Sequence, residues 1–146
     1  MADFGRSFER RGAGPWYARG LRFQCLICGR CCGGQAGYIW ISPEEIQQAA
    51  RMLGLRAGDF RSLYVAEYDR GLSLREMASG DCCMLHNGRC RIYAVRPLQC
   101  RTWPFWPSNL SSPRAWQEAA ARCPGIGSGR LWTVPQIEAQ RKRMLI

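Results

Sequence analysis

Residues 24–34 of the chain read QCLICGRCCGG and place four cysteines within eight positions. The C-x2-C-x2-C spacing lets a tight loop aim successive sulfur atoms at one centre, at the distance of about 2.3 Å that is typical of a zinc–sulfur bond. The glycines tolerate the positive backbone dihedral angles that such a loop needs. Four cysteines so close together have little packing role in a core, so the segment predicts a metal-binding loop.

The adjacent pair Cys31 and Cys32 extends this motif. Neighbouring side chains generally point apart, so we expect the pair to serve two metal sites, one site and its outer shell, or a bulky cluster. The other ligands would come from the later cysteines, which are Cys82, Cys83, Cys90, Cys100 and Cys123. Among them, Cys83 stands beside Met84 in a predicted strand and is interpreted as a small buried apolar side chain.

Length and composition favour one small globular domain. The chain has 146 residues, of which 47% are hydrophobic and 22% are charged, a balance that excludes wholesale disorder. There are nine cysteines but one histidine, so a metal site would be almost purely thiolate. The apolar runs are far shorter than the ~18 residues of a membrane span, and no apolar signal segment follows the N-terminal arginines. We therefore expect a cytoplasmic protein with reduced thiols, where closely spaced cysteines indicate metal ligands or redox centres before disulfides. An odd total of nine also suits a disulfide framework poorly.

The charge is strongly basic, with 21 lysines and arginines, of which one is a lysine, against 11 acidic residues, and a net charge of +10. Such a balance is compatible with nucleic acid or another acidic partner. Deprotonated thiols would offset part of it, so some arginines are interpreted as internal counter-charge. Five arginines stand next to a cysteine and are either its outer shell or solvated surface, namely Arg30, Arg89, Arg91, Arg101 and Arg122.

Helix signals are clearest after the first cysteine cluster. Ser42, Pro43 and Glu45 form a capping box that predicts the start of a helix, with Gly54 as its stop. We further expect a strand over 38–41, a second helix from Asp59 to about Tyr68, a helix from Ser112 to about Ala121, and an amphipathic segment after Pro135.

A second cysteine region covers residues 80–107. Its Asn87-Gly88 dipeptide predicts a hairpin that sets Met84-Leu85 against residues 91–93 and brings Cys82 toward Cys90. The aromatic segment 103–107 is interpreted as core packing rather than as a base-stacking or partner-binding platform. His86, beside the turn, is expected to be exposed.

These signals predict an α+β fold: a small, helix-dominated, irregular domain with a short β-hairpin, organised around a cysteine-ligated metal centre. We expect a flexible arm rich in glycine and arginine over residues 1–19, the metal-binding domain over 20–127 and a C-terminal helical tail over 128–146.

Five motifs in fixed order carry a resemblance: FQCLICGRCCGG, GYIWISPEEI, GDCCML, GRCRIYAVRPLQCRTWPFW and RCPGIG, which together span about residues 21–127. In these the chain resembles the CxxCxxCC family of zinc- or iron-chelating cysteine-cluster domains. The resemblance implies eight metal ligands, which are Cys25, Cys28, Cys31, Cys32, Cys82, Cys90, Cys100 and Cys123. It implies that Cys83 occupies a variable position, and it implies no activity.

The sequence leaves the choice between zinc and iron open. The first cluster and the Cys123-Pro124 pair are typical of ferredoxin loops, but glutamine stands at position 35, where the fourth ligand would fall. A zinc ribbon would carry a second C-x2-C, which the sequence lacks. Eight thiolates suit two four-sulfur zinc sites, or one four-iron cluster with four cysteines left for a second centre.

For function, we expect a metal-binding protein with a structural or electron-transfer role. The alternatives are an arginine-rich nucleic-acid-binding module stabilised by metal, or a redox or metal-transfer enzyme. The sequence has no phosphate-binding loop, dinucleotide fingerprint or nucleophile elbow, so an enzyme is not favoured. The expected partner is a metal ion. A protein partner is left open, and so is nucleic acid, which is not favoured; no membrane is expected.

Overall fold

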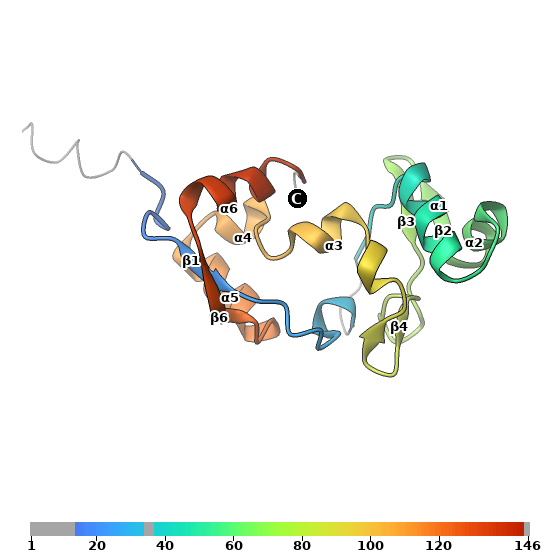
Figure 1. Cartoon of the computed structure of the whole chain (residues 1–146), viewed down its shortest axis with the longest axis horizontal. Helices are drawn as coiled ribbons and strands as arrows, with labels where there is room; N and C mark the ends of the chain where they lie inside the picture. The colour runs from blue at the N-terminus through green and yellow to red at the C-terminus, as the bar shows by residue number, and fades with distance from the viewer. Residues whose placement is uncertain (1–13, 34–36, 145–146) are drawn as a thin grey trace, which may run out of the picture.

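The computed structural model describes residues 14–33 and 37–144 of the chain (Figure 1). Its helices are α1 (Pro43–Met52), α2 (Ala57–Tyr64), α3 (Leu98–Thr102), α4 (Pro107–Leu110), α5 (Pro113–Arg122) and α6 (Val134–Arg141), with 3-10 turns at Arg30–Cys32 and Tyr93–Val95. Its strands form three antiparallel pairs, namely β1 (Leu21–Phe23) with β6 (Ile126–Trp132), β2 (Val65–Tyr68) with β3 (Gly71–Leu74), and β4 (Leu85–His86) with β5 (Arg89–Cys90). A small mixed helix-and-sheet fold is thereby confirmed.

Helix α1 begins and ends where its sequence signals predict. The Ser42 hydroxyl accepts a hydrogen bond from the Glu45 amide at 3.2 Å, and the Glu45 carboxylate accepts one from the Ser42 amide at 2.9 Å. This capping box satisfies two of the free amides of the first turn. Just after the helix, Gly54 adopts a positive φ of 69°, which ends it.

Helices α1 and α2 and the β2–β3 hairpin surround a first core, which gathers at one end of the molecule in Figure 1. Its buried residues are Ile41, Ile46, Ala49, Ala50, Phe60, Val65, Leu74, Cys82, Met84 and Ile92.

Two of the predicted elements differ in the structure. The second helix starts at Ala57 and ends at Tyr64, because residues 65–68 pair with β3 instead of continuing it. The expected strand over 38–41 is an extended segment with one isolated bridge, Trp40 to Ser73, beside β3.

The predicted turn at Asn87-Gly88 is confirmed, since both residues have positive φ, 50° and 75°. The hairpin is shorter than expected, because its ladder is limited to Leu85 opposite Cys90 and His86 opposite Arg89. Of residues 91–93, Arg91 does face Met84, because its amide donates to the Met84 carbonyl at 2.8 Å. Ile92 is instead fully buried in the first core, and a 3-10 turn starts at Tyr93.

A second core lies at the other end of the molecule, among β1, β6, α4, α5 and α6. Its buried residues are Tyr17, Phe23, Phe105, Leu110, Trp116 and Ile137. Helix α5 begins after Ser112 as predicted, whereas the β1–β6 pair has no counterpart in the sequence-based expectations. The division into arm, domain and tail stays a prediction, and residues 1–13 of the arm lie outside the described residues. Tyr17 and Ile137, which fall outside 20–127, nevertheless pack into this core.

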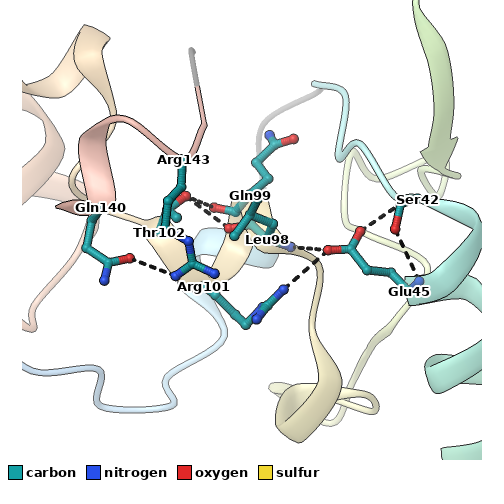
Figure 2. Close-up of polar contacts among 8 residues, drawn as sticks. All are labelled: Ser42, Glu45, Leu98, Gln99, Arg101, Thr102, Gln140 and Arg143. Carbon is teal, nitrogen blue, oxygen red and sulfur yellow. Dashed lines mark hydrogen bonds and ion pairs between the residues drawn. The ribbon is translucent and has the colours of Figure 1, made fainter.

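Two segments run between the cores: the cysteine loop 24–33 and the stretch 96–104, which contains α3. Glu45 fastens α3 to α1, as Figure 2 shows, because its carboxylate also accepts the Leu98 amide at 2.8 Å and pairs with Arg101 at 3.4 Å. The buried Gln99 side chain makes a second link. It accepts the Trp40 amide at 2.9 Å and donates to the Tyr38 carbonyl at 2.8 Å. The helix that carries Cys100 is thus held against the first core.

The helices of the described residues are each about ten residues or shorter, and none of them could cross a membrane.

We predict that Glu45→Ala lowers the free energy of unfolding of the metal-loaded protein by about 1–3 kcal/mol, because it removes a helix cap and a hydrogen bond that joins two elements. Denaturant unfolding followed by circular dichroism measures this. The control is Glu44→Ala, an exposed neighbour in the same helical turn, which should change stability by less than about 0.5 kcal/mol. Equal losses in the two variants would contradict the linking role of Glu45.

Candidate metal centre

The cysteine loop 24–33 makes two close contacts with other segments, and each contact involves a glycine. The Gln24 amide donates to the Gly125 carbonyl at 3.1 Å, and a Cβ at Gly125 would collide with the Gln24 carbonyl. Gly29 has a φ of 74° and lies so close to the Gly88 carbonyl that a Cβ would not fit there either. These approaches bring the stretch after Cys123, and the tip of the β4–β5 hairpin, next to the loop.

Cys32 connects this loop to the second cysteine region. Its amide donates to the Gly29 carbonyl at 3.0 Å within a 3-10 turn, and its carbonyl accepts the Cys82 amide at 2.7 Å. Its thiol lies within hydrogen-bond reach of the thiols of Cys31 and Cys90. The expected proximity of Cys82 and Cys90 therefore takes the form of two separate contacts with Cys32.

Two adjoining cavities lie at this junction. The first has a volume of about 460 Å³, and the cysteines that line it are Cys25, Cys28, Cys31, Cys32, Cys90, Cys100 and Cys123. The second has a volume of about 620 Å³, and its cysteines are Cys31, Cys32, Cys82 and Cys100. Each of the eight cysteines implied by the family resemblance thus lines at least one cavity. Their ligand role stays a prediction.

Cys83 lines neither cavity. Its thiol approaches the Tyr64 carbonyl at 3.6 Å and packs against the first core. This agrees with its interpretation as a packed side chain.

The ionisation of the thiols follows from their contacts. Hydrogen bonding with Cys32 lowers the pKa of Cys31, and likewise that of Cys90, to about 7, even though burial opposes the change. The same two bonds, together with burial, raise the pKa of Cys32 far above its usual range. Burial raises the pKa of Cys100 to about 12, and repulsion from Cys31 and Cys90 adds to it. Such opposite shifts are expected of thiols that share one small space, because ionisation of one disfavours ionisation of the next.

Cys25 and Cys82 are held by other neighbours. A hydrogen bond with Cys25, followed by burial, raises the pKa of the Tyr93 hydroxyl. A hydrogen bond with Cys83, followed by burial, raises the pKa of the Cys82 thiol well above its usual range, and that of Cys83 falls. Repulsion from Cys100 also contributes to the rise in the pKa of Cys82.

The first cavity is also lined by basic side chains. Among the described residues these are all arginines, namely Arg30, Arg96, Arg101, Arg122 and Arg130, and no acidic side chain lines the cavity. Three of them lie over aromatic rings, at 4.1 Å for Arg96 on Tyr93, 5.6 Å for Arg122 on Trp103 and 4.0 Å for Arg130 on Trp132. Guanidinium groups in such positions can balance thiolate charge.

The sequence-based choice of arginines was partly right. Arg30, Arg101 and Arg122 line the cavity, whereas Arg89 and Arg91 do not. Arg91 instead bonds the Tyr64 hydroxyl at 3.2 Å. Arg96 was missed, although its place between Cys90 and Cys100 could have indicated it. Arg130 was missed because it stands on β6, whose pairing with β1 was not foreseen.

The predictions for His86 and for the aromatic segment 103–107 agree with the structure. His86 is exposed and lines neither cavity. Phe105 is 1% exposed and stacks on Trp116 with ring centroids 5.7 Å apart, so the aromatic segment 103–107 contributes to the core.

By its chemistry the donor set fits a thiolate-bound metal, because sulfur ligands select zinc and iron–sulfur clusters. Within residues 14–33 and 37–144, no three histidine, cysteine or acidic side chains already stand as a ligand set for one ion. The thiols line the cavities, but they are not arranged around a single coordination point.

Comparison with known proteins finds a relative in Methanocaldococcus jannaschii, named "Uncharacterized protein MJ0661", which is 26% identical over 91 residues. The match covers 61% of this chain and 48% of the relative, so the chain spans about half the length of that protein. No solved structure matches the chain. The model of the family CxxCxxCC, described as "Putative zinc- or iron-chelating domain", matches residues 24–124. This stretch contains all nine cysteines and most of the chain, and the protein therefore belongs to the CxxCxxCC family.

Proposed function

We propose that the protein binds zinc or iron through the eight cysteines that line the two cavities, and that the bound metal joins its two cores. The observation that carries this proposal is the convergence of thiols from four separate stretches of the chain on one junction. Cys82 belongs to the first core and Cys123 packs against the second. A metal held by cysteines from both sides would act as a cross-link between them.

The distribution of thiols supports two adjoining centres. Four cysteines line the first cavity alone, namely Cys25, Cys28, Cys90 and Cys123. Cys82 lines the second cavity alone, and Cys31, Cys32 and Cys100 line both. Two four-sulfur zinc sites, or one four-iron cluster beside a second centre, would each use this supply. Binding would draw the thiols together and release their protons.

The role that follows is structural, with electron transfer added if the metal is an iron–sulfur cluster. Five arginines around the first cavity support an anionic centre, because they would offset the charge of metal-bound thiolates. The ligands must be reduced thiols, and a reducing compartment such as the cytoplasm supplies them.

Elemental analysis and an absorption spectrum of anaerobically purified protein test the proposal. We expect either about two zinc ions per chain with no visible band, or iron with matching sulfide and a broad brown band. Dithionite should bleach that band reversibly if the centre carries electrons. Protein that contains neither metal, and takes up neither on reconstitution, would refute the proposal.

Single cysteine variants test the ligand set. Cys28→Ser removes a ligand. Loss of an outer-shell partner already lowers metal affinity about 10–100-fold, so this variant should lower it by more than that. Cys83→Ala is the matched control and should keep the full metal content, since Cys83 lines neither cavity. Competition with a chromophoric chelator measures both affinities. The reverse pattern would show that the ninth cysteine is wrongly assigned.

Removal of the metal should unfold at least the junction, because structural thiolate sites contribute on the order of 10 kcal/mol at neutral pH. The measurement is thermal unfolding of the reduced protein with and without chelator. Re-addition of the metal provides the control for irreversible damage. An unchanged melting temperature in the chelated sample would be incompatible with a structural metal.

A further inference from the structure

The indole of Trp103 forms part of the wall that the two cysteine cavities share. Its Nε1 atom is buried and has no hydrogen-bond partner among the described residues. Other indoles have partners: Trp16 donates to the Leu110 carbonyl at 2.7 Å, and Trp132 donates to the Phe23 carbonyl at 3.0 Å. An indole N–H is a donor only, so Trp103 lacks an acceptor at a buried place.

A buried donor without an acceptor costs free energy, and buried polar groups in folded proteins nearly always find a partner. The neighbouring indole of Trp106, by contrast, donates to the Gln99 carbonyl at 3.0 Å and to the Thr102 hydroxyl at 3.1 Å. The shared wall also contains the thiols of Cys31, Cys32 and Cys100. Sulfur bound to a metal is an electron-rich acceptor, and hydrogen bonds to such sulfur tune the centre.

The ring is also held in place. Trp106 packs edge-on against it with centroids 4.9 Å apart, and Arg122 lies over its face at 5.6 Å. The chain after it is fixed, since Pro104 is fully buried and its carbonyl accepts a bond from Asn109 at 2.9 Å. These contacts fix the position of the ring in the shared wall.

We infer that the Trp103 Nε1–H donates a hydrogen bond to a metal-bound sulfur at the shared wall, which makes Trp103 a positioning residue of the centre. This inference rests on the proposed function. The bond stabilises negative charge on that sulfur, so it strengthens metal binding and, in an iron–sulfur cluster, raises the reduction potential.

The test uses the whole chain loaded with cadmium-113, a thiophilic probe for four-sulfur sites. In the unaltered protein we expect the Trp103 indole proton to show scalar coupling to one cadmium resonance through the N–H to sulfur bond. This measurement needs no variant. An indole proton that couples to no cadmium and exchanges rapidly with water would overturn the inference, since water would then be its partner.

Trp103→Phe keeps an aromatic ring but removes the donor. We expect it to shift one cadmium resonance and to weaken metal binding by about 10–100-fold in chelator competition. Trp16→Phe is the matched control, because its indole bonds elsewhere, and it should leave both readouts unchanged. If Trp103→Phe also leaves both unchanged while metal content stays full, the inference fails and the proposed function stands. A chain that binds no cadmium, zinc or iron removes both.

Discussion

Two small cores in one chain must be kept together, and that constraint governs the rest of the structure. Each core gathers around its own helices and strand pairs, and two segments run between them. Both of these segments contain cysteines, and both are tied to neighbouring elements by backbone or buried side-chain hydrogen bonds. The polar contacts of Glu45 and Gln99 orient α3, and the glycine contacts at Gly29 and Gly125 orient the cysteine loop. Placement of sulfur atoms is the common result.

Local signals could be read from the sequence, and long-range pairing could not. The capping box of α1 and the turn at Asn87-Gly88 depend on residues a few positions apart, so their chemistry is visible in the sequence. The second helix was drawn too long, because Val65 and Tyr68 suit a strand as well as a helix and their pairing with β3 decides the outcome. Strand β6 reads IGSGRLW, whose glycines and lack of alternation conceal a strand until Leu21 and Phe23 stand beside it.

The same distinction between local signals and long-range contacts holds for the candidate site. The cysteines were identifiable because their clustering is rare, and Cys83 could be set apart by its apolar neighbourhood. Which arginines accompany them could not be predicted from adjacency. A side chain next to a cysteine points away from it as readily as toward it, and Arg91 turns to Tyr64. Trp103 illustrates a stricter limit, since a missing hydrogen-bond partner is a property of the fold and has no sequence signature.

The close approach of Gly125 to Gln24 has a consequence for the order of assembly. About a hundred residues separate the two, and closing a flexible loop of that length costs about 4 kcal/mol of chain entropy beyond a constant term. Contacts this distant in sequence are met late, after local helices and hairpins have formed. During synthesis the first cysteine cluster emerges long before Cys123. The family's most conspicuous motif is therefore available to capture an ion first, and the last cysteine can join only after about ninety further residues have been made.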